Sequence, residues 1–442
     1  MTEEYDLLIV GAGTGGSVAA ETAAKKGLKA CIVDCKPEDE IGVKVCGDAI
    51  GGHHFKELGI PPPTGDDFDI EIEGIKLYSP DLSTVFVVNG PGVTGYIVNR
   101  HSFGQRLLKA ALDSGIKLRD SMLVTKPLIE DGCVRGVLAH NLKDKQKQTL
   151  RAKVTIDASG AAAAIRSRLP DEFGIEREVS KKDLMSCYRE IRGGVELEKG
   201  YCQIYLNQAV AEGGYFWIFP KSEGRANVGV GVQASKRGVH PKTQLYSHIF
   251  TQPKFRHTTT LEAGGGYVPT RRPIDCLVGN GVMLVGDAAC LVNPIHGGGI
   301  GPSMVSGRLA AEMASEAIER SDTSKRGLWR YNTGIMKAYG AKQASLDIFR
   351  IFLQETSDEE LNFGMKHGLV KESDVLSASM KGDLTLSIPD KAERVLRGLR
   401  RPDFLIRLEE VARKMRGIKE HFLNYPTPEE FPAWRARIKT FY

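Results

Sequence analysis

The beginning of the chain carries two short apolar runs separated by glycines and an alanine-rich segment. The first run covers 5–10 and ends in the sequence GAGTGG, the alanine-rich segment covers 17–26, and the second run covers 28–33. Apolar runs of this length that end in glycine are typical of buried strands, and alanine favours helices. We therefore predict a strand, a glycine turn, a helix that ends near Gly27, and a second, parallel strand.

The same buried pattern returns later, whereas other regions alternate. Apolar runs at 153–160 and 281–301 again end in glycines, and helical periodicity covers 98–115 and 302–319. Alternating, strand-like segments are typical of antiparallel sheets. They include DIEIEGIKLYS and the segments 201–206, 215–220 and 226–232.

These patterns predict an α/β chain, α+β overall, in three units. The first is a Rossmann-like nucleotide-binding domain with a parallel sheet, the second an inserted antiparallel-sheet substrate domain, and the third a helical C-terminal region. Their predicted ranges are 1–60, 95–175 and 270–340 for the first, 61–94 and 176–269 for the second, and 341–442 for the third.

Composition and charge narrow the class of protein. The chain has 442 residues, of which 41% are hydrophobic and 26% charged, and this excludes a disordered chain, a collagen-like fibre and a coiled coil. The net charge of +5 is spread without a dense basic stripe, so we expect no nucleic-acid partner. The eight cysteines form no CxxC pair and no Cys/His cluster, so we expect neither a disulfide framework nor a metal site.

The chain is expected to be cytoplasmic, with contact to a membrane surface left open. Acidic residues stand near the N-terminus where a signal peptide would be basic, and no apolar window reaches the roughly 20 residues of a membrane span. The amphipathic segment 391–420 is basic, as a solvated helix face or a surface for anionic lipid head groups would be. It includes Arg394, Arg397, Arg400 and Arg401.

The glycines of the first turn have the spacing GxGxxG. Gly11 can make the tight turn, Gly13 lets a pyrophosphate approach the backbone, and Gly16 lets the helix pack on the strand, with Gly15 in the same turn. The helix N-terminus offers unpaired N–H groups to the pyrophosphate. Asp34 ends the second strand, where its carboxylate can accept hydrogen bonds from ribose hydroxyls. We therefore predict a dinucleotide site.

A second glycine-rich turn decides which dinucleotide we expect. The sequence LVGDAA places Asp287 after a late strand, where it can hold the ribityl hydroxyls of a flavin. Bare backbone at Gly297, Gly298 and Gly299 can approach an isoalloxazine ring. The helix that begins near Ile300 can stabilise negative charge on reduced flavin. This arrangement resembles the second FAD fingerprint of the glutathione-reductase-like flavoproteins, which include aromatic hydroxylases, flavin halogenases and geranylgeranyl reductases.

Two other segments fit the same resemblance, which implies FAD as the cofactor and makes the Rossmann-like domain an FAD-binding domain. The helix with Arg100, Phe103 and Leu107 resembles the arginine helix that these families place near FAD. IDASG at 156–160 resembles their third strand-and-glycine segment. Because one GxGxxG is present and no CxxxxC redox pair, we expect an external electron donor, NAD(P)H docking transiently or a ferredoxin.

Two more motifs resemble geranylgeranyl reductases, the prenyl-chain reductases of archaeal lipid, chlorophyll and quinone pathways. The first has the form YxWxFP and carries Tyr215, Trp217 and Phe219. The second resembles their KxCG segment and carries Cys46 and Gly47, both expected beside the flavin. The family's usual proline three residues before the tyrosine is replaced by Glu212. The resemblance covers 5–340.

The resemblance implies an enzyme that reduces isolated C=C bonds of geranylgeranyl chains, in archaeal isoprenoid lipids or in geranylgeranyl diphosphate. Hydride would come from N5 of reduced flavin and a proton from Cys46, Tyr215 or a water that they hold. Because alternate residues of a strand share a face, the three aromatic residues are expected to line an apolar tunnel. The residues expected to contact the substrate are Tyr215, Trp217, Phe219, His54 and His296.

Simpler interpretations and other functions remain open at this point. An aromatic strand face is often plain core, a lone cysteine is often a small buried apolar residue, and adjacent histidines often begin a helix. The main alternative function is an FAD-dependent monooxygenase or flavin halogenase that acts on an apolar substrate, since halogenases carry a related WxWxIP segment. A lipid-carrying or electron-relay flavoprotein is a third. Oxygen separates the first two, because a monooxygenase requires it and it would inhibit a reductase.

Overall fold

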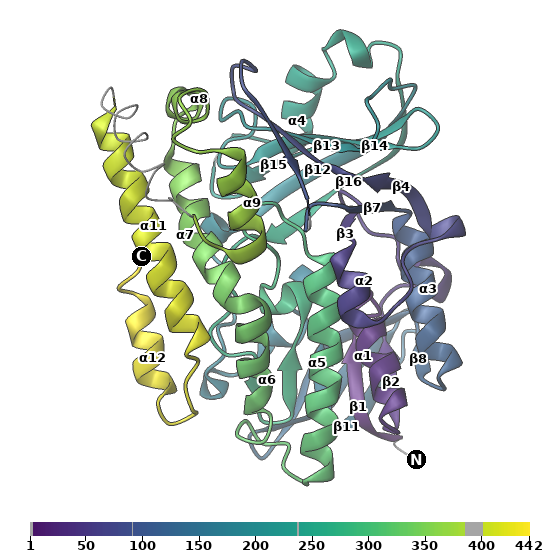
Figure 1. The fold of residues 1–442 in the computed structure, drawn as a ribbon. Coiled ribbons are helices and arrows are strands. Elements are labelled where there is room, and N and C mark those ends of the chain that lie inside the picture. Colours follow the sequence, from purple (N-terminus) through teal and green to yellow (C-terminus); the bar gives the residue numbers. More distant parts are fainter. Residues whose placement is uncertain (1–2, 91, 237, 385–400) are drawn as a thin grey trace.

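The computed structural model describes residues 3–90, 92–236, 238–384 and 401–442. These residues form a mixed α/β fold with a mainly parallel sheet, a large, mainly antiparallel sheet and a layer of C-terminal helices (Figure 1). The predicted fold class is therefore confirmed. The exact boundaries of the three predicted units stay a prediction.

A sheet of eight strands forms the lower half of the molecule in Figure 1. Its path runs β17-β18-β11-β1-β2-β8, with β10 attached to β11 and β9 attached to β10. The first strand pairs in parallel with both β2 and β11, as the two apolar runs at the chain start predict. The strands are β1 (Glu4–Val10), β2 (Ala30–Val33), β8 (Lys117–Arg119), β9 (Met122–Glu130), β10 (Cys133–Asn141), β11 (Lys147–Asp157), β17 (Val278–Gly279) and β18 (Val282–Leu284).

Three helices pack side by side against this sheet, with α1 (Thr14–Lys25) between α3 (Arg100–Asp113) and α5 (Ile300–Glu319) (Figure 1). The predicted helices at the chain start, at 98–115 and at 302–319 are thus confirmed. The two helices α1 and α5 approach closely because glycines without side chains lie at their contact. A Cβ on Gly15 would lie 2.6 Å from Ser303 Oγ, and a Cβ on Gly307 would overlap the Gly15 carbonyl oxygen. Gly15 therefore packs helix against helix.

The upper sheet has seven strands in the order β16-β12-β15-β14-β13-β5-β6. Neighbours are antiparallel except β13 and β5, which are parallel. The predicted strands at 201–206, 215–220 and 226–232 all belong to it. The strands are β5 (Gly74–Tyr78), β6 (Val85–Asn89), β12 (Leu184–Gly193), β13 (Tyr201–Tyr205), β14 (Tyr215–Lys221), β15 (Arg225–Gln233) and β16 (Thr259–Pro269).

A small third sheet lies between the two large ones in Figure 1 and has the order β3-β7-β4. It consists of β3 (Ala49–Gly51), β4 (Phe68–Ile72) and β7 (Gly95–Val98). The alternating run DIEIEGIKLYS is therefore split, because β4 joins this sheet and β5 joins the seven-stranded one. Two short helices, α2 (His53–Leu58) and α4 (Pro241–Gln244), follow β3 and β15.

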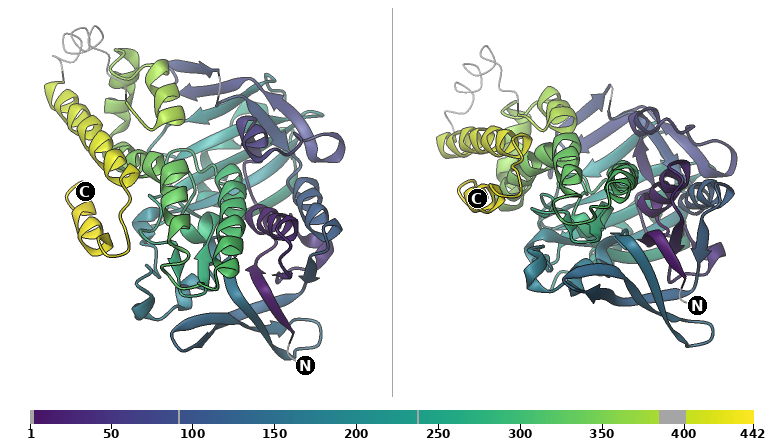
Figure 2. Two further views of the ribbon diagram at one scale, coloured as in Figure 1. Left: turned by 60° about the horizontal axis from the view of Figure 1, so that its bottom comes forward. Right: turned by 90° about the horizontal axis from the view of Figure 1, so that it is seen from below.

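The C-terminal part is helical, as predicted, and forms a layer at one edge of the molecule (Figure 2). Within it α7 and α11 pack along each other. The basic residues Arg394, Arg397 and Arg400 lie outside the described residues, and Arg401 forms an ion pair of 3.5 Å with Glu359. Among the described helices, none combines the length and apolar character needed to cross a membrane. The helices are α6 (Trp329–Ile335), α7 (Ala341–Glu355), α8 (Asp358–Lys366), α9 (Glu372–Lys381), α11 (Pro402–Leu423) and α12 (Phe431–Ile438).

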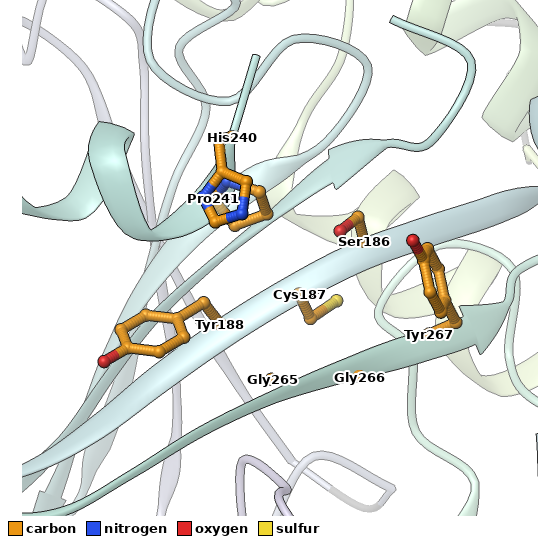
Figure 3. A pocket seen from close by; sticks show the side chains of 8 residues that line it. All are labelled: Ser186, Cys187, Tyr188, His240, Pro241, Gly265, Gly266 and Tyr267. Atoms are coloured by element: carbon orange, nitrogen blue, oxygen red, sulfur yellow. The ribbon is translucent and has the colours of Figure 1, made fainter. Parts of the chain in front are cut away.

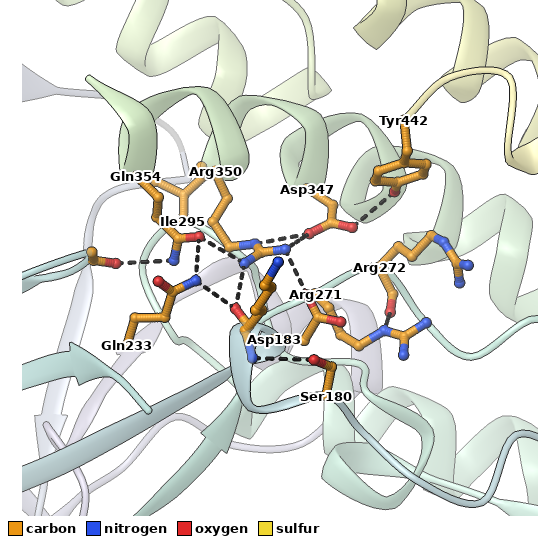
Figure 4. A network of polar contacts seen from close by, with 12 residues as sticks. Ser180, Asp183, Gln233, Arg271, Arg272, Ile295, Asp347, Arg350, Gln354 and Tyr442 are labelled. Atoms are coloured by element: carbon orange, nitrogen blue, oxygen red, sulfur yellow. Dashed lines mark hydrogen bonds and ion pairs between the residues drawn. The ribbon is translucent and has the colours of Figure 1, made fainter. Parts of the chain in front are cut away.

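One polar network joins this helical layer to the upper sheet (Figure 4). The Arg350 guanidinium on α7 lies 2.9 Å from Asp183, just before β12, and 2.8 Å from Asp347. The Tyr442 hydroxyl donates to Asp347 over 2.8 Å. Because Arg350 and Asp347 are buried, these charge-assisted bonds hold α7 and the last residue of the chain in one arrangement against the sheet.

Candidate functional site

The GxGxxG turn has the backbone conformation that its glycines predict. Gly11 adopts a φ of +104°, and a Cβ there would lie 2.5 Å from the Ala158 carbonyl oxygen. A Cβ on Gly16 would overlap the Gly11 carbonyl oxygen, so helix α1 and the turn are in direct contact. A Cβ on Gly13 would meet nothing within 4 Å. The backbone at Gly13 therefore faces open space at the helix N-terminus, where no side chain caps the free N–H groups.

Asp34 stands beside this turn, at the end of β2. Its carboxylate accepts hydrogen bonds from the backbone N–H groups of Ala12 (2.6 Å) and Lys36 (2.9 Å). Two bonds leave part of the lone-pair capacity of the two oxygens free. The carboxylate is thus oriented by backbone and can still accept from a ribose hydroxyl.

The second glycine turn meets the first at Ser303. Cβ atoms on Gly15 and on Gly286 would each lie 2.6 Å from Ser303 Oγ, so the first turn of α1 and the turn after β18 both contact the first turn of α5. Helix α5 begins at Ile300 with Gly299 as its N-cap and no capping side chain. Two helix N-termini with free N–H groups therefore face the same region, which favours a bound anion.

Asp287 lies in the short turn after β18, next to the start of α5. A Cβ on Gly299 would lie 3.3 Å from Asp287 Oδ1, and Lys44 Nζ lies 3.2 Å from Asp287 Oδ2. The contact with Lys44 joins this turn to residues 43–48, which we call the Cys46 loop.

Arg100 begins α3 and is 8% exposed. Its Nε and Nη1 atoms are buried and have no hydrogen-bond partner among the described residues. A buried guanidinium without partners is costly, and a bound pyrophosphate would supply acceptors for it. The two glycine turns, Asp34 and Arg100 therefore fit an elongated anionic dinucleotide.

The Cys46 loop reaches from the glycine turns to the seven-stranded sheet. A Cβ on Gly47 would lie 3.1 Å from the Phe219 ring on β14. A Cβ on Gly264, in β16, would overlap the Val45 side chain. The loop thus packs on the sheet face that carries Phe219.

The three aromatic residues of the YxWxFP motif form a row on that face. The ring centroids of Tyr215 and Trp217 are 6.0 Å apart, and those of Trp217 and Phe219 are 6.2 Å apart. Phe216 and Ile218 point to the opposite face and belong to the core there. The Tyr215 hydroxyl donates a hydrogen bond of 2.7 Å to the carbonyl of His296, beside the second glycine turn.

Glycines flank the aromatic row on the neighbouring strands. Across the sheet, Tyr215 is in register with Gly231, Cys187 and Gly266. Two residues further along β14, Trp217 is in register with Gly229, and a Cβ on Gly229 would overlap the indole. On this face, Gly229 and Gly231 of β15 leave room for the rings, and the side chains of Cys187 and Arg189 follow on β12. The period-two spacing of Gly229 and Gly231 in β15 is a signal that sequence reasoning could have used.

Four ionisable groups near the row are uncharged at neutral pH, whereas the buried Arg189, in register with Gly229, forms an ion pair of 2.6 Å with Glu262. Burial, with the charge of Asp48, raises the pKa of the Cys46 thiol, and burial raises that of Cys187 to about 12. Burial also raises the pKa of Tyr215 well above its ordinary value. The pKa of His296 is lowered to about 4, mainly by burial and further by the charge of Lys342. The face is therefore suited to an apolar ligand.

His54, the other histidine expected near the substrate, packs against α5. A Cβ on Gly301 would overlap its ring, and its Nδ1 lies 3.2 Å from the Tyr339 hydroxyl and 3.5 Å from Glu57. These contacts bring His54 to the second glycine turn and not to the aromatic row. Its role in substrate binding stays a prediction.

A pocket of about 240 Å³ lies where α4 meets β12 and β16 (Figure 3). His240 and Pro241 face the two strands in that view, and the lining includes Cys187 and Gly266, which share the register line of Tyr215. The pocket is thus near the end of that line and not at the glycine turns. The remaining lining residues are Ser186, Tyr188, Gly265 and Tyr267.

Comparison with known proteins identifies relatives over the whole chain. The model of the geranylgeranyl reductase catalytic domain matches residues 183–268, which span β12 to β15 and nearly all of β16. The chain is 43% identical over 441 residues to a digeranylgeranylglycerophospholipid reductase of Sulfolobus acidocaldarius, covering 98% of this chain and 96% of the relative. It is 32% identical over 418 residues to the protein of the same name from Methanosarcina acetivorans, covering 90% and 99%.

Solved structures share the fold. A geranylgeranyl bacteriochlorophyll reductase-like protein of Thermoplasma acidophilum superposes with a TM-score of 0.78 at 27% identity, covering 93% of this chain and all of that one. A flavin-dependent brominase superposes with a TM-score of 0.69 at 20% identity, with coverage of 93% and 100%. At that identity, the brominase shows a common fold and no more.

Proposed function

Because the chain belongs to the digeranylgeranylglycerophospholipid reductase family, we propose that it reduces isolated C=C bonds in the geranylgeranyl chains of archaeal isoprenoid lipids. The observation that carries the proposal is the identity of 43% over 441 residues. The row of Tyr215, Trp217 and Phe219 beside the Cys46 loop supports it, because an apolar chain needs apolar contacts and few polar ones.

We propose FAD as the cofactor. Gly11, Gly13 and the N-terminus of α1 would hold its pyrophosphate, with Arg100 as a further donor. Asp34 would accept from the ribose, and Asp287 from the ribityl chain, with Gly297, Gly298, Gly299 and Ile300 against the ring. When bound and reduced, a flavin supplies a hydride.

Cys46 is the better supported of the two proposed proton donors. The proton of Tyr215 is already donated to the His296 carbonyl over 2.7 Å, and burial raises the pKa of this phenol. Cys46 Sγ instead accepts a hydrogen bond from the Asp48 N–H over 3.3 Å, and its own raised pKa keeps the thiol protonated at neutral pH. Cys46 can therefore hold a proton for delivery to the second alkene carbon.

The aromatic row would orient the substrate for this step. An isolated alkene has no carbonyl to polarise, so alignment and exclusion of water have to lower the barrier. The rings of Tyr215, Trp217 and Phe219 would hold a flexible chain that can slide from one double bond to the next, and Gly229 leaves room for the indole.

Two partners complete the proposal. Electrons would come from an external donor, NAD(P)H or a ferredoxin, since the chain contains one GxGxxG motif. The lipid would be drawn from a membrane surface that the protein contacts from the cytoplasm.

An anaerobic single-turnover experiment tests the function. The flavin of the purified protein is reduced with dithionite, the excess is removed, a geranylgeranylated phospholipid is added, and flavin absorbance and lipid mass are followed. Reoxidation of the flavin with a gain of two hydrogen atoms per double bond is the expected result. If the flavin stays reduced with every prenyl substrate until oxygen is admitted, the reductase proposal is wrong and a monooxygenase takes its place.

A further inference from the structure

Asn227 connects the two sides of the site. It lies on β15, is 0% exposed, and its amide bonds to three groups. Its Oδ1 accepts from the Trp217 indole N–H over 3.0 Å. Its Nδ2 donates to the Cys46 carbonyl over 2.8 Å and to Asp48 Oδ2 over 2.9 Å. One buried side chain thus joins the aromatic row to the Cys46 loop, which is about 180 residues away in sequence.

The chemistry of the partners requires an asparagine. An indole N–H can only donate, whereas the Cys46 carbonyl and the Asp48 carboxylate accept. The side chain between them must therefore present one acceptor and a pair of donors at this length. An aspartate would turn an acceptor toward two acceptors, and a leucine would leave all three groups without this partner.

Asp48 holds the loop from the other side. It adopts a φ of +64°, a left-handed conformation that is strained for a residue with a side chain. Its buried carboxylate is kept in place by Asn227 and by Lys221 Nζ at 3.5 Å. In this conformation its backbone N–H donates to Cys46 Sγ over 3.3 Å. The carbonyl and the sulfur of Cys46 are therefore both held, one by Asn227 directly and one through Asp48.

We propose that Asn227 is a positioning residue, which holds the Cys46 thiol at a constant separation from the Trp217 ring. The inference rests on the proposed function, because a double bond lying on the indole is then aligned with the proton on Cys46. Without the amide, the loop is still joined to β14 by packing, such as that of Gly47 on Phe219, and by the ion pair of Asp48 with Lys221, but neither contact holds the Trp217 indole N–H. The separation between the Cys46 thiol and a double bond on the Trp217 ring is then no longer held constant.

The test compares Asn227→Leu with Asn332→Leu in the flavin-loaded enzyme. Asn332 is a matched control, since it is also 0% exposed and bonds to the Leu277 N–H (2.8 Å) and Cys276 Sγ (3.6 Å) away from the site. Two quantities are measured: kcat and KM for the prenyl lipid, and the pH profile of iodoacetamide labelling at Cys46, followed by peptide mass analysis. We expect Asn227→Leu to lower kcat about 100-fold with little change in KM.

The labelling profile of Cys46 separates positioning from stability. It should shift in Asn227→Leu and stay as in the wild type in Asn332→Leu, whose lost amide affects stability alone. If the two variants have the same kcat, and Cys46 labels as in the wild type in both, Asn227 is a structural residue and the proposal is overturned. A wild-type enzyme that reduces no prenyl lipid would contradict the proposed function instead, and the labelling arm would still report on Asn227.

Two milder variants keep the test sharp if Asn227→Leu does not fold. Trp217→Phe keeps a ring and removes the indole N–H, and Asn227→Asp keeps the shape and removes the donors. Each should shift the labelling of Cys46. Combined with Asn227→Asp, Trp217→Phe should add little further shift, because both changes break the same connection. Fully additive shifts would contradict a shared network.

Discussion

The glycine turns and the aromatic row are built in different ways. The turns use backbone: Gly11 and Gly13 lie in one tight segment, and Gly299 precedes the N-terminus of α5. The row uses three side chains of β14, and the neighbouring residues Asn227 and Cys187 come from β15 and β12. A backbone cradle suits a ligand of constant shape and charge, whereas a side-chain surface can be adapted to a substrate. The two regions should therefore respond differently to substitution.

The largest effect on stability is expected at Gly16, where the backbone of α1 contacts the backbone of the first glycine turn. In Gly16→Ala the new Cβ would overlap the Gly11 carbonyl oxygen, so α1 must shift, and we expect a loss of about 1–3 kcal/mol in stability together with loss of bound flavin. Gly13→Ala is the matched control, because its Cβ meets nothing within 4 Å. It should unfold like the wild type without cofactor and still retain less flavin. The unfolding temperature and the flavin content of both variants are measured. Equal unfolding temperatures would contradict the packing role of Gly16.

The next effect concerns charge in the cofactor region. Arg100→Met removes a buried guanidinium whose Nε and Nη1 lack partners, so the cofactor-free protein should be no less stable than the wild type. Flavin affinity should fall about 10–100-fold, since the variant loses charge-assisted bonds to the cofactor. Fluorescence titration of the apoprotein measures it. Unchanged affinity with a lower unfolding temperature would assign Arg100 to the fold.

A smaller effect is expected on the substrate side. A Cβ on Gly266 would meet nothing within 4 Å, and this residue shares the register line of Tyr215. Gly266→Leu should fold normally and raise KM for the prenyl lipid about 10-fold by filling space at the β16 end of this register line. Gly266→Ala serves as the size control and should change KM little. If the leucine variant keeps the wild-type KM, the chain does not pass this line.

The smallest effect is a pH dependence of stability. Burial raises the pKa of Cys187 from 9.0 to about 12, so between these values the folded state keeps a proton that the unfolded state releases. Stability should therefore fall as pH rises above 9, by less than about 1.4 kcal/mol per pH unit for this partly exposed residue. Cys187→Ala should show a shallower fall than the wild type in thermal unfolding at several alkaline pH values. Parallel curves would mean that this thiol does not contribute.

The sequence predicted the elements whose signals are local. The apolar runs and glycines at the chain start predicted β1, α1 and β2, and the spacing of three aromatic residues predicted that they share one face of β14. Sequence reasoning did not find that β4 joins the small third sheet, that Gly15 packs against Ser303, or that His54 lies against Gly301. Each of these depends on which distant segment lies opposite.

By itself, then, the sequence determined the family, the fold class and the two glycine turns, because periodicity and glycine spacing act over a few residues and need no partner. Only the tertiary structure decided what surrounds the Cys46 thiol. Asn227 lies in no motif and Asp48 only follows the KxCG segment, and the roles of both side chains depend on hydrogen bonds across about 180 residues. The donors and the acceptor of a buried amide need hydrogen-bond partners, and the register of the strands determines which groups lie within reach.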